Sequence, residues 1–114
     1  MELTSITIGV PVSDMAKAKT WYIILLGATK TIQPVPNVFE FEISKGFWLQ
    51  LIEDPALKAG DGTLRFGVKD IEAEKSRLAI AGISVGKIQE VPGVIRLCRF
   101  TDPFGNKLSL YQEI

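Results

Sequence analysis

The feature that most constrains the fold is an internal repeat. Residues 30–41, Lys-Thr-Ile-Gln-Pro-Val-Pro-Asn-Val-Phe-Glu-Phe, recur 56 positions later as Gly-Lys-Ile-Gln-Glu-Val-Pro-Gly-Val-Ile-Arg-Leu. The segment Val-Ser-Asp-Met-Ala-Lys-Ala-Lys from residue 12 parallels Val-Lys-Asp-Ile-Glu-Ala-Glu-Lys from residue 68 at the same offset. Such self-similarity indicates two copies of one supersecondary unit. We predict repeats at 1–54 and 62–114, joined by a linker at 55–61 within a single domain spanning 1–114.

Composition and charge exclude several classes of protein. The 114 residues carry 13 basic and 13 acidic side chains without a block of either sign, whereas nucleic-acid binding normally needs a basic face. No apolar run approaches the ~20 residues of a membrane span, and the amino terminus does not have the pattern of a signal peptide. The single cysteine, Cys98, fits a reducing compartment. We therefore predict a cytoplasmic protein without nucleic-acid or membrane partners.

Hydrophobic periodicity predicts one strand, one helix and three further strands in each copy. The first copy has strands near 3–12, 29–34, 37–44 and 46–53, and the second near 66–68, 85–90, 93–101 and 106–112. Ser13 or Asp14 caps the first helix and Asp70 the second, while Gly27 and Gly82 end them. The last hairpin of the second copy is predicted to be three residues longer than its counterpart. The fold class is therefore α+β, with two tandem βαβββ modules.

Three short motifs, in their order and spacing, resemble those of the vicinal-oxygen-chelate superfamily, the group of glyoxalase I, the bleomycin-resistance proteins and the extradiol dioxygenases. They are Val-Ser-Asp-Met at 12–15, Trp-Tyr-x-x-x-Leu-Gly at 21–27 and Asp-Pro-Phe-Gly-Asn at 102–106. Together with the duplication, the resemblance covers essentially the whole chain. It implies the glyoxalase/bleomycin-resistance fold, in which each module curves into a half-open sheet and paired modules enclose a ligand cavity.

In metal-dependent members, the resemblance implies one metal ligand on the first strand and one on the last strand of each module. The matching positions here are Thr7, Gln50, Thr63 and Ser109. All four are neutral, whereas the metals of such sites are held by imidazole or carboxylate groups. The chain also has no histidine. We predict neither a metal nor another cofactor, and expect the four side chains to hydrogen-bond one another or to contact a ligand.

Strand alternation predicts which residues line the cup. If Leu49, Leu51, Leu64, Phe66, Leu108 and Leu110 face the helices, their neighbours face the cavity. Those neighbours are Trp48, Gln50, Ile52, Thr63, Arg65, Gly67, Lys107, Ser109 and Tyr111, and the same logic adds Glu40, Glu42, Arg96 and Cys98. Such a pocket, apolar with a few convergent polar groups, is typical of ligand sites.

Each candidate also has a purely structural interpretation. Trp48 and Tyr111 stack on a ligand or simply pack, and Arg65 and Arg96 hold a carboxylate or phosphate or pair with the glutamates. Cys98, without a histidine to activate it, is interpreted as a small buried apolar residue. The candidate ligand-binding residues are thus Thr7, Trp48, Gln50, Thr63, Arg65, Arg96, Ser109 and Tyr111.

Three functional hypotheses follow. The first is a metal-free small-molecule binding protein that holds an organic ligand in the cup of a homodimer. Ile24 lies about 150° from the centre of the buried face of the first helix, with Ile23 beside it, and these apolar residues suggest a subunit contact. The resemblance also implies dimers. The second is a lyase, isomerase or dioxygenase-like enzyme of the same superfamily, with Glu40 or Glu42 as general base. The third is a degenerate module that is kept for its dimer surface.

Overall fold

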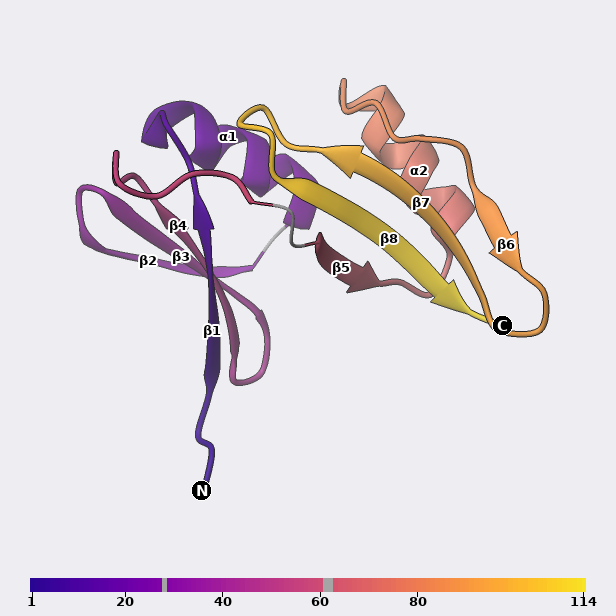
Figure 1. Cartoon of the computed structure of the whole chain (residues 1–114), viewed down its shortest axis with the longest axis horizontal. Coiled ribbons are helices and arrows are strands. Elements are labelled where there is room, and N and C mark those ends of the chain that lie inside the picture. Colours follow the sequence, from indigo (N-terminus) through magenta and orange to yellow (C-terminus); the bar gives the residue numbers. More distant parts are fainter. Residues whose placement is uncertain (28, 61–62) are drawn as a thin grey trace. The chain divides into compact units, whose positions relative to one another are not determined.

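The chain forms two compact units, Met1–Ala59 (unit 1) and Gly60–Ile114 (unit 2). The structure is a computed structural model that describes residues 1–27, 29–60 and 63–114 (Figure 1). Each unit contains one helix and one four-stranded sheet, so the predicted α+β class with two tandem modules is confirmed. The boundary between the units falls inside the predicted linker at 55–61. The grouping of both units into a single domain stays a prediction.

Unit 1 follows the predicted order of one strand, one helix and three strands. Its elements are β1 (Ile6–Pro11), α1 (Met15–Leu26), β2 (Lys30–Val35), β3 (Val38–Ser44) and β4 (Phe47–Ile52). The sheet has the order β1-β4-β3-β2, in which β1 runs parallel to β4 and the other pairs are antiparallel. A parallel partner needs a crossover, and α1 with the β2–β3 hairpin supplies it.

Unit 2 repeats this topology. Its elements are β5 (Thr63–Gly67), α2 (Ile71–Ile80), β6 (Gln89–Val91), β7 (Ile95–Thr101) and β8 (Lys107–Glu113), and the sheet order is β5-β8-β7-β6. Strand β5 is parallel to β8. Strand β6 is shorter than the predicted strand at 85–90, because only its three residues pair with β7. The shared topology is the structural counterpart of the sequence repeat.

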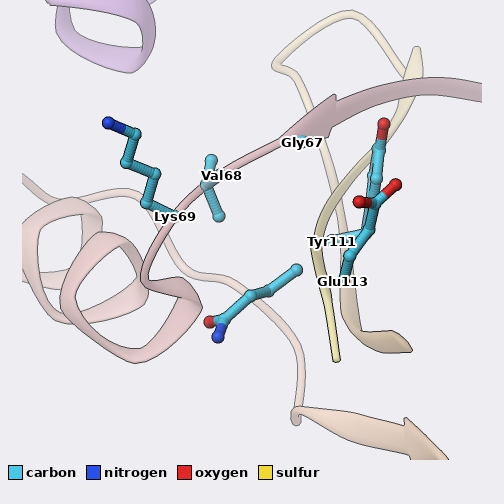
Figure 2. A pocket seen from close by; sticks show the side chains of 6 residues that line it. Gly67, Val68, Lys69, Tyr111 and Glu113 are labelled. Atoms are coloured by element: carbon cyan, nitrogen blue, oxygen red, sulfur yellow. The ribbon is translucent and has the colours of Figure 1, made fainter. Parts of the chain in front are cut away.

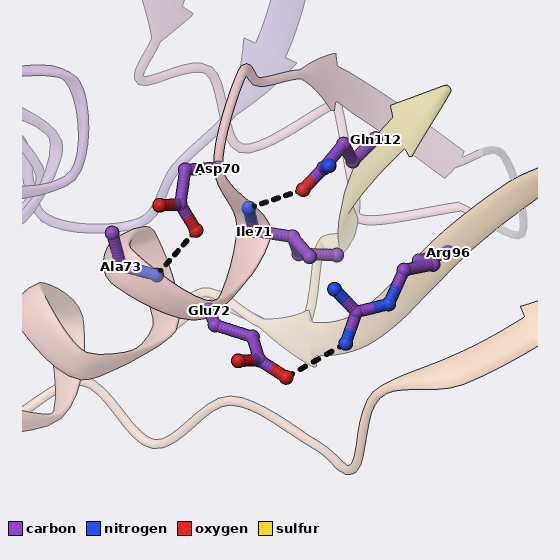
Figure 3. A network of polar contacts seen from close by, with 6 residues as sticks. All are labelled: Asp70, Ile71, Glu72, Ala73, Arg96 and Gln112. Atoms are coloured by element: carbon purple, nitrogen blue, oxygen red, sulfur yellow. Dashed lines mark hydrogen bonds and ion pairs between the residues drawn. The ribbon is translucent and has the colours of Figure 1, made fainter. Parts of the chain in front are cut away.

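Side-chain carboxylates start both helices as predicted. In α1, Asp14 accepts a hydrogen bond from the backbone N–H of Lys17 at 3.1 Å, and Gly27 follows the last turn with a φ of 75°. In α2, Asp70 accepts from Ala73 N–H at 3.0 Å, and the Gln112 side chain accepts from Ile71 N–H at 2.9 Å (Figure 3). These bonds satisfy amide groups that have no partner within the helix, so α2 is attached at its first turn to β8.

Each helix covers one side of its own sheet. In unit 1, α1 packs on β3 and β4, and the fully buried Phe41, Leu49 and Leu51 alternate with less buried neighbours. In unit 2, α2 buries Ile71 and Leu78. The helix ends at Ile80 and the following Ala81 is exposed, while the next apolar residue, Ile83, is buried. We call the side of each sheet opposite its helix the open face.

The two modules are offset by 59 residues, not 56, in their last two strands. Glu42 pairs with Trp48 in unit 1, and Thr101 pairs with Lys107 in unit 2. Residues 45–46 connect β3 to β4, whereas residues 102–106 connect β7 to β8, so the last hairpin is three residues longer, as predicted. The residues that change the offset enter the chain before the equivalent part of β7, and because this change is odd it reverses the side on which a β7 residue lies.

Candidate functional site

The open face of unit 1 is built from two rows of side chains that run across the sheet. In the first row, Thr7 is the strand partner of Trp48, Trp48 of Glu42, and Glu42 of Lys30. The Lys30 ammonium lies 5.8 Å from the centroid of the Trp48 ring, within range of a cation–π contact. The indole is half-buried and Lys30 is exposed. Sequence reasoning missed Lys30, because only the β2–β3 register brings it beside Glu42.

The second row of unit 1 lies one strand step, about 7 Å, from the first. Gly9 is the partner of Gln50, Gln50 of Glu40, and Glu40 of Ile32. Gln50 and Glu40 are half-buried. The prediction that Trp48, Gln50, Glu40 and Glu42 share a face agrees with this register. An aromatic ring, an amide and two carboxylates thus lie together on one open surface.

The open face of unit 2 carries different charges. Arg65 and Arg99 are both strand partners of Ser109, one on each side, and Lys107 is the partner of both Thr63 and Thr101. Ser109 is buried, whereas the two arginines are exposed. Arg99 donates a hydrogen bond to the Gln89 side chain at 2.8 Å. At the positions where unit 1 has Gly9, Gln50 and Glu40, unit 2 therefore has two guanidinium groups around a hydroxyl.

Tyr111 lies across its neighbouring strand, against Gly67. A Cβ atom at Gly67 would be 2.9 Å from both Cζ and Oη of the Tyr111 ring, so the missing side chain makes room for the phenol. Beside this contact is an open pocket of about 410 Å³. Figure 2 shows Lys69 on one side of it and Tyr111 with Glu113 on the other; Gly67, Val68 and Gln112 complete the lining.

Arg96 and Cys98 do not lie on the open face, and the prediction that they line the cup is wrong. Arg96 donates to Glu72 of α2 at 2.7 Å (Figure 3), and Cys98 is buried as the partner of Leu110. The physical reason is the odd change in offset, which turns both side chains toward the helix. Arg99 takes the open-face position instead. Burial raises the pKa of the Cys98 thiol, which agrees with its interpretation as a small buried apolar residue.

The residues matched to a metal site do not fit a divalent cation. In each unit the two candidates lie on neighbouring strands but are not direct partners: Gln50 faces Gly9 rather than Thr7, and Ser109 faces Arg65 rather than Thr63. Arg65 and Lys107 place positive charge beside the unit 2 pair, which opposes a cation electrostatically. Within residues 1–27, 29–60 and 63–114, no group of three or more His, Cys, Asp and Glu side chains could hold a metal ion.

Of the two neighbouring isoleucines expected to be exposed on the first helix, one is. Ile23 keeps 48% of its surface exposed, whereas Ile24 is half-buried. In the part of the chain that the structure describes, neither helix is both long and apolar enough to cross a bilayer.

Comparison with known proteins supports the resemblance found in the motifs. No family model and no curated protein matches the sequence, but solved structures do. A glyoxalase/bleomycin resistance protein from Catenulispora acidiphila is 26% identical with a TM-score of 0.84, and the match covers 99% of this chain and 100% of that one. TnmS3, an antibiotic-binding protein from Streptomyces sp. CB03234, is 26% identical with a TM-score of 0.80, over 100% and 97% of the two chains.

A third solved structure, a glyoxalase/bleomycin resistance protein from the same Streptomyces strain, is 28% identical with a TM-score of 0.75, over 95% and 99% of the two chains. These proteins are similar to this chain over nearly its whole length. The chain has the vicinal-oxygen-chelate fold of the glyoxalase/bleomycin-resistance/dioxygenase superfamily.

Proposed function

We propose that this protein binds a small organic molecule on the open faces of its sheets and does so without a metal. The observation that carries this proposal is the open face of unit 1, where the half-buried Trp48 ring lies beside Lys30 and in the row next to Gln50. A partly exposed indole with adjacent hydrogen-bonding groups suits a flat ligand. The antibiotic-binding description of the similar protein TnmS3 supports a binding role.

The candidate residues take distinct roles in this proposal. On the open face of unit 1, Trp48 stacks on a ligand, Gln50 hydrogen-bonds it and Thr7 borders it. On the open face of unit 2, Tyr111, Ser109 and Thr63 take the same three roles. Arg65 meets an anionic group. Arg96 has no part in it, because its guanidinium is directed toward α2 and pairs with Glu72. An enzymatic role for Glu40 or Glu42 stays a separate hypothesis.

Metal content tests the metal-free part of the proposal. After incubation with Zn²⁺, Ni²⁺, Mn²⁺ and Fe²⁺ followed by exhaustive dialysis, we expect mass spectrometry to find well under one ion per subunit. The reason is that the matched positions offer only neutral oxygens, beside cations in unit 2. About one retained ion per subunit would contradict the proposal and would instead support a metal-dependent enzyme.

The cup of a homodimer is part of the same proposal. The exposed Ile23 on α1 is a candidate subunit contact. We expect light scattering to give twice the mass of the 12.6 kDa chain. A monomeric mass at micromolar concentration would contradict the homodimer. It would not contradict ligand binding, which the titrations test.

A further inference from the structure

We propose that the open face of unit 2 is an oxyanion site, in which Arg65 and Arg99 hold a carboxylate or phosphate group of an aromatic ligand. This inference rests on the proposed binding function and specifies the class of ligand. The two arginines lie on the strands that flank β8, and both have Ser109 as their strand partner. With strands about 4.8 Å apart, their Cα atoms are about 10 Å apart, so their long side chains can converge on one group above Ser109.

The four arginines of the chain, all in unit 2, divide into two kinds. Arg77 and Arg96 form ion pairs with Glu74 and Glu72 of α2, at 2.8 and 2.7 Å. The open-face arginines have no such neutralising group in the described part of the chain: Arg99 bonds the neutral amide of Gln89, and Arg65 forms no ion pair there. Two uncompensated guanidinium groups on one face are suited to bidentate recognition of an oxyanion.

The repeat shows that this charge pattern is not needed for the fold. At the positions of Arg65 and Arg99, the open face of unit 1 carries Gly9 and Glu40 around Gln50, yet its sheet has the same topology. Lys107 lies in the next row of unit 2 and adds a third positive charge. Among the described strand residues on this face, the one carboxylate is Glu113, which lines the pocket with Tyr111 and lies four residues beyond Ser109 on β8, opposite Ile95. The face therefore favours an anion electrostatically.

The aromatic part of the ligand is inferred from what lies beside the arginines. Tyr111 is two residues beyond Ser109 on β8 and therefore shares its face, about 7 Å away. Its ring lies against Gly67 and forms one wall of the 410 Å³ pocket (Figure 2). A flat ligand on the phenol would place a carboxylate or phosphate substituent between the two guanidinium groups.

The test compares three ligands of the same ring system by calorimetry: 2-naphthoate, 2-naphthyl phosphate and the neutral 2-naphthamide. We expect the wild-type protein to bind at least one of the two anions about 10-fold or more tightly than the amide, because charge-assisted hydrogen bonds form only with the anions. The order of the two anions distinguishes a carboxylate site from a phosphate site. Arg65→Gln and Arg99→Gln should each weaken binding of the anion about 10-fold and leave that of the amide unchanged.

Arg77→Gln is the matched control, since it removes the same charge from the outer side of α2, where Arg77 pairs with Glu74. We expect it to change anion binding less than about 2-fold, and melting temperatures should show that all variants fold. Equal binding of anions and amide would overturn the oxyanion site while leaving the binding function intact. An equal loss in Arg77→Gln would also overturn it, by showing a diffuse charge effect. Absence of binding by both anions would overturn it as well.

Discussion

The Phe41→Ala variant is expected to have a free energy of unfolding lower by about 3–5 kcal/mol than that of the wild-type protein. Removal of a large core side chain loses both its transfer free energy and the contacts around the resulting cavity. Phe41 has no exposed surface, and its ring packs edge-on against Phe39 with centroids 5.0 Å apart. Because a domain of this size is stabilised by only about 5–15 kcal/mol, urea denaturation should show a large decrease in the midpoint.

The adjacent residue on the same strand provides the control. Glu42→Ala changes a half-buried side chain on the open face, and we expect it to alter the free energy of unfolding by less than about 1 kcal/mol. Similar losses in the two variants would mean that the alternation of β3 relative to α1 is not as described. A larger loss for Glu42→Ala would reverse the assignment of the two faces.

Trp48→Ala is expected to weaken binding of a planar aromatic ligand by about 10–100-fold. Loss of a stacking surface removes about 1.5–3 kcal/mol of apolar and aromatic contact, which corresponds to this change in affinity. The ligand for the titration comes from a panel of neutral and charged planar aromatic compounds, screened by their effect on the melting temperature. In the wild-type protein the bound ring should also change tryptophan fluorescence, and in Trp48→Ala this change should disappear.

The Trp21→Phe variant distinguishes the fluorescence of Trp48 from that of the other tryptophan. Trp21 lies on α1, edge-on to the buried Tyr22 at 4.9 Å between ring centroids, and we expect its replacement to leave both the affinity and the ligand-induced change in fluorescence intact. If Trp21→Phe removes the signal and Trp48→Ala does not, the ligand binds elsewhere. If no compound in the panel shifts the melting temperature, the binding function itself loses its support.

The open face of unit 1 and the β5 and β8 part of unit 2 were largely predictable, whereas the β7 part of unit 2 was not. The run Phe39–Ile43 alternates apolar and acidic residues, so the period of two fixes which side chains face α1. The repeat also located the helices, because Asp14 and Asp70 precede amphipathic segments in both copies. For β7, the prediction used the offset of 56 residues between the two copies, whereas in the structure β7 is offset from β3 by 59 residues. Arg96 and Cys98 were consequently assigned to the wrong side, and Arg99 was missed.

The sequence by itself therefore determined the two-module architecture, the helix starts and the neutral character of the positions matched to a metal site. These are properties of composition, periodicity and repetition, which are local along the chain. Only the tertiary structure decided which side chains are neighbours: Lys30 lies beside Trp48, Glu72 pairs with Arg96, and Arg65 and Arg99 flank Ser109. Such neighbours depend on strand register, and a shift by one residue moves a side chain to the other face of the sheet.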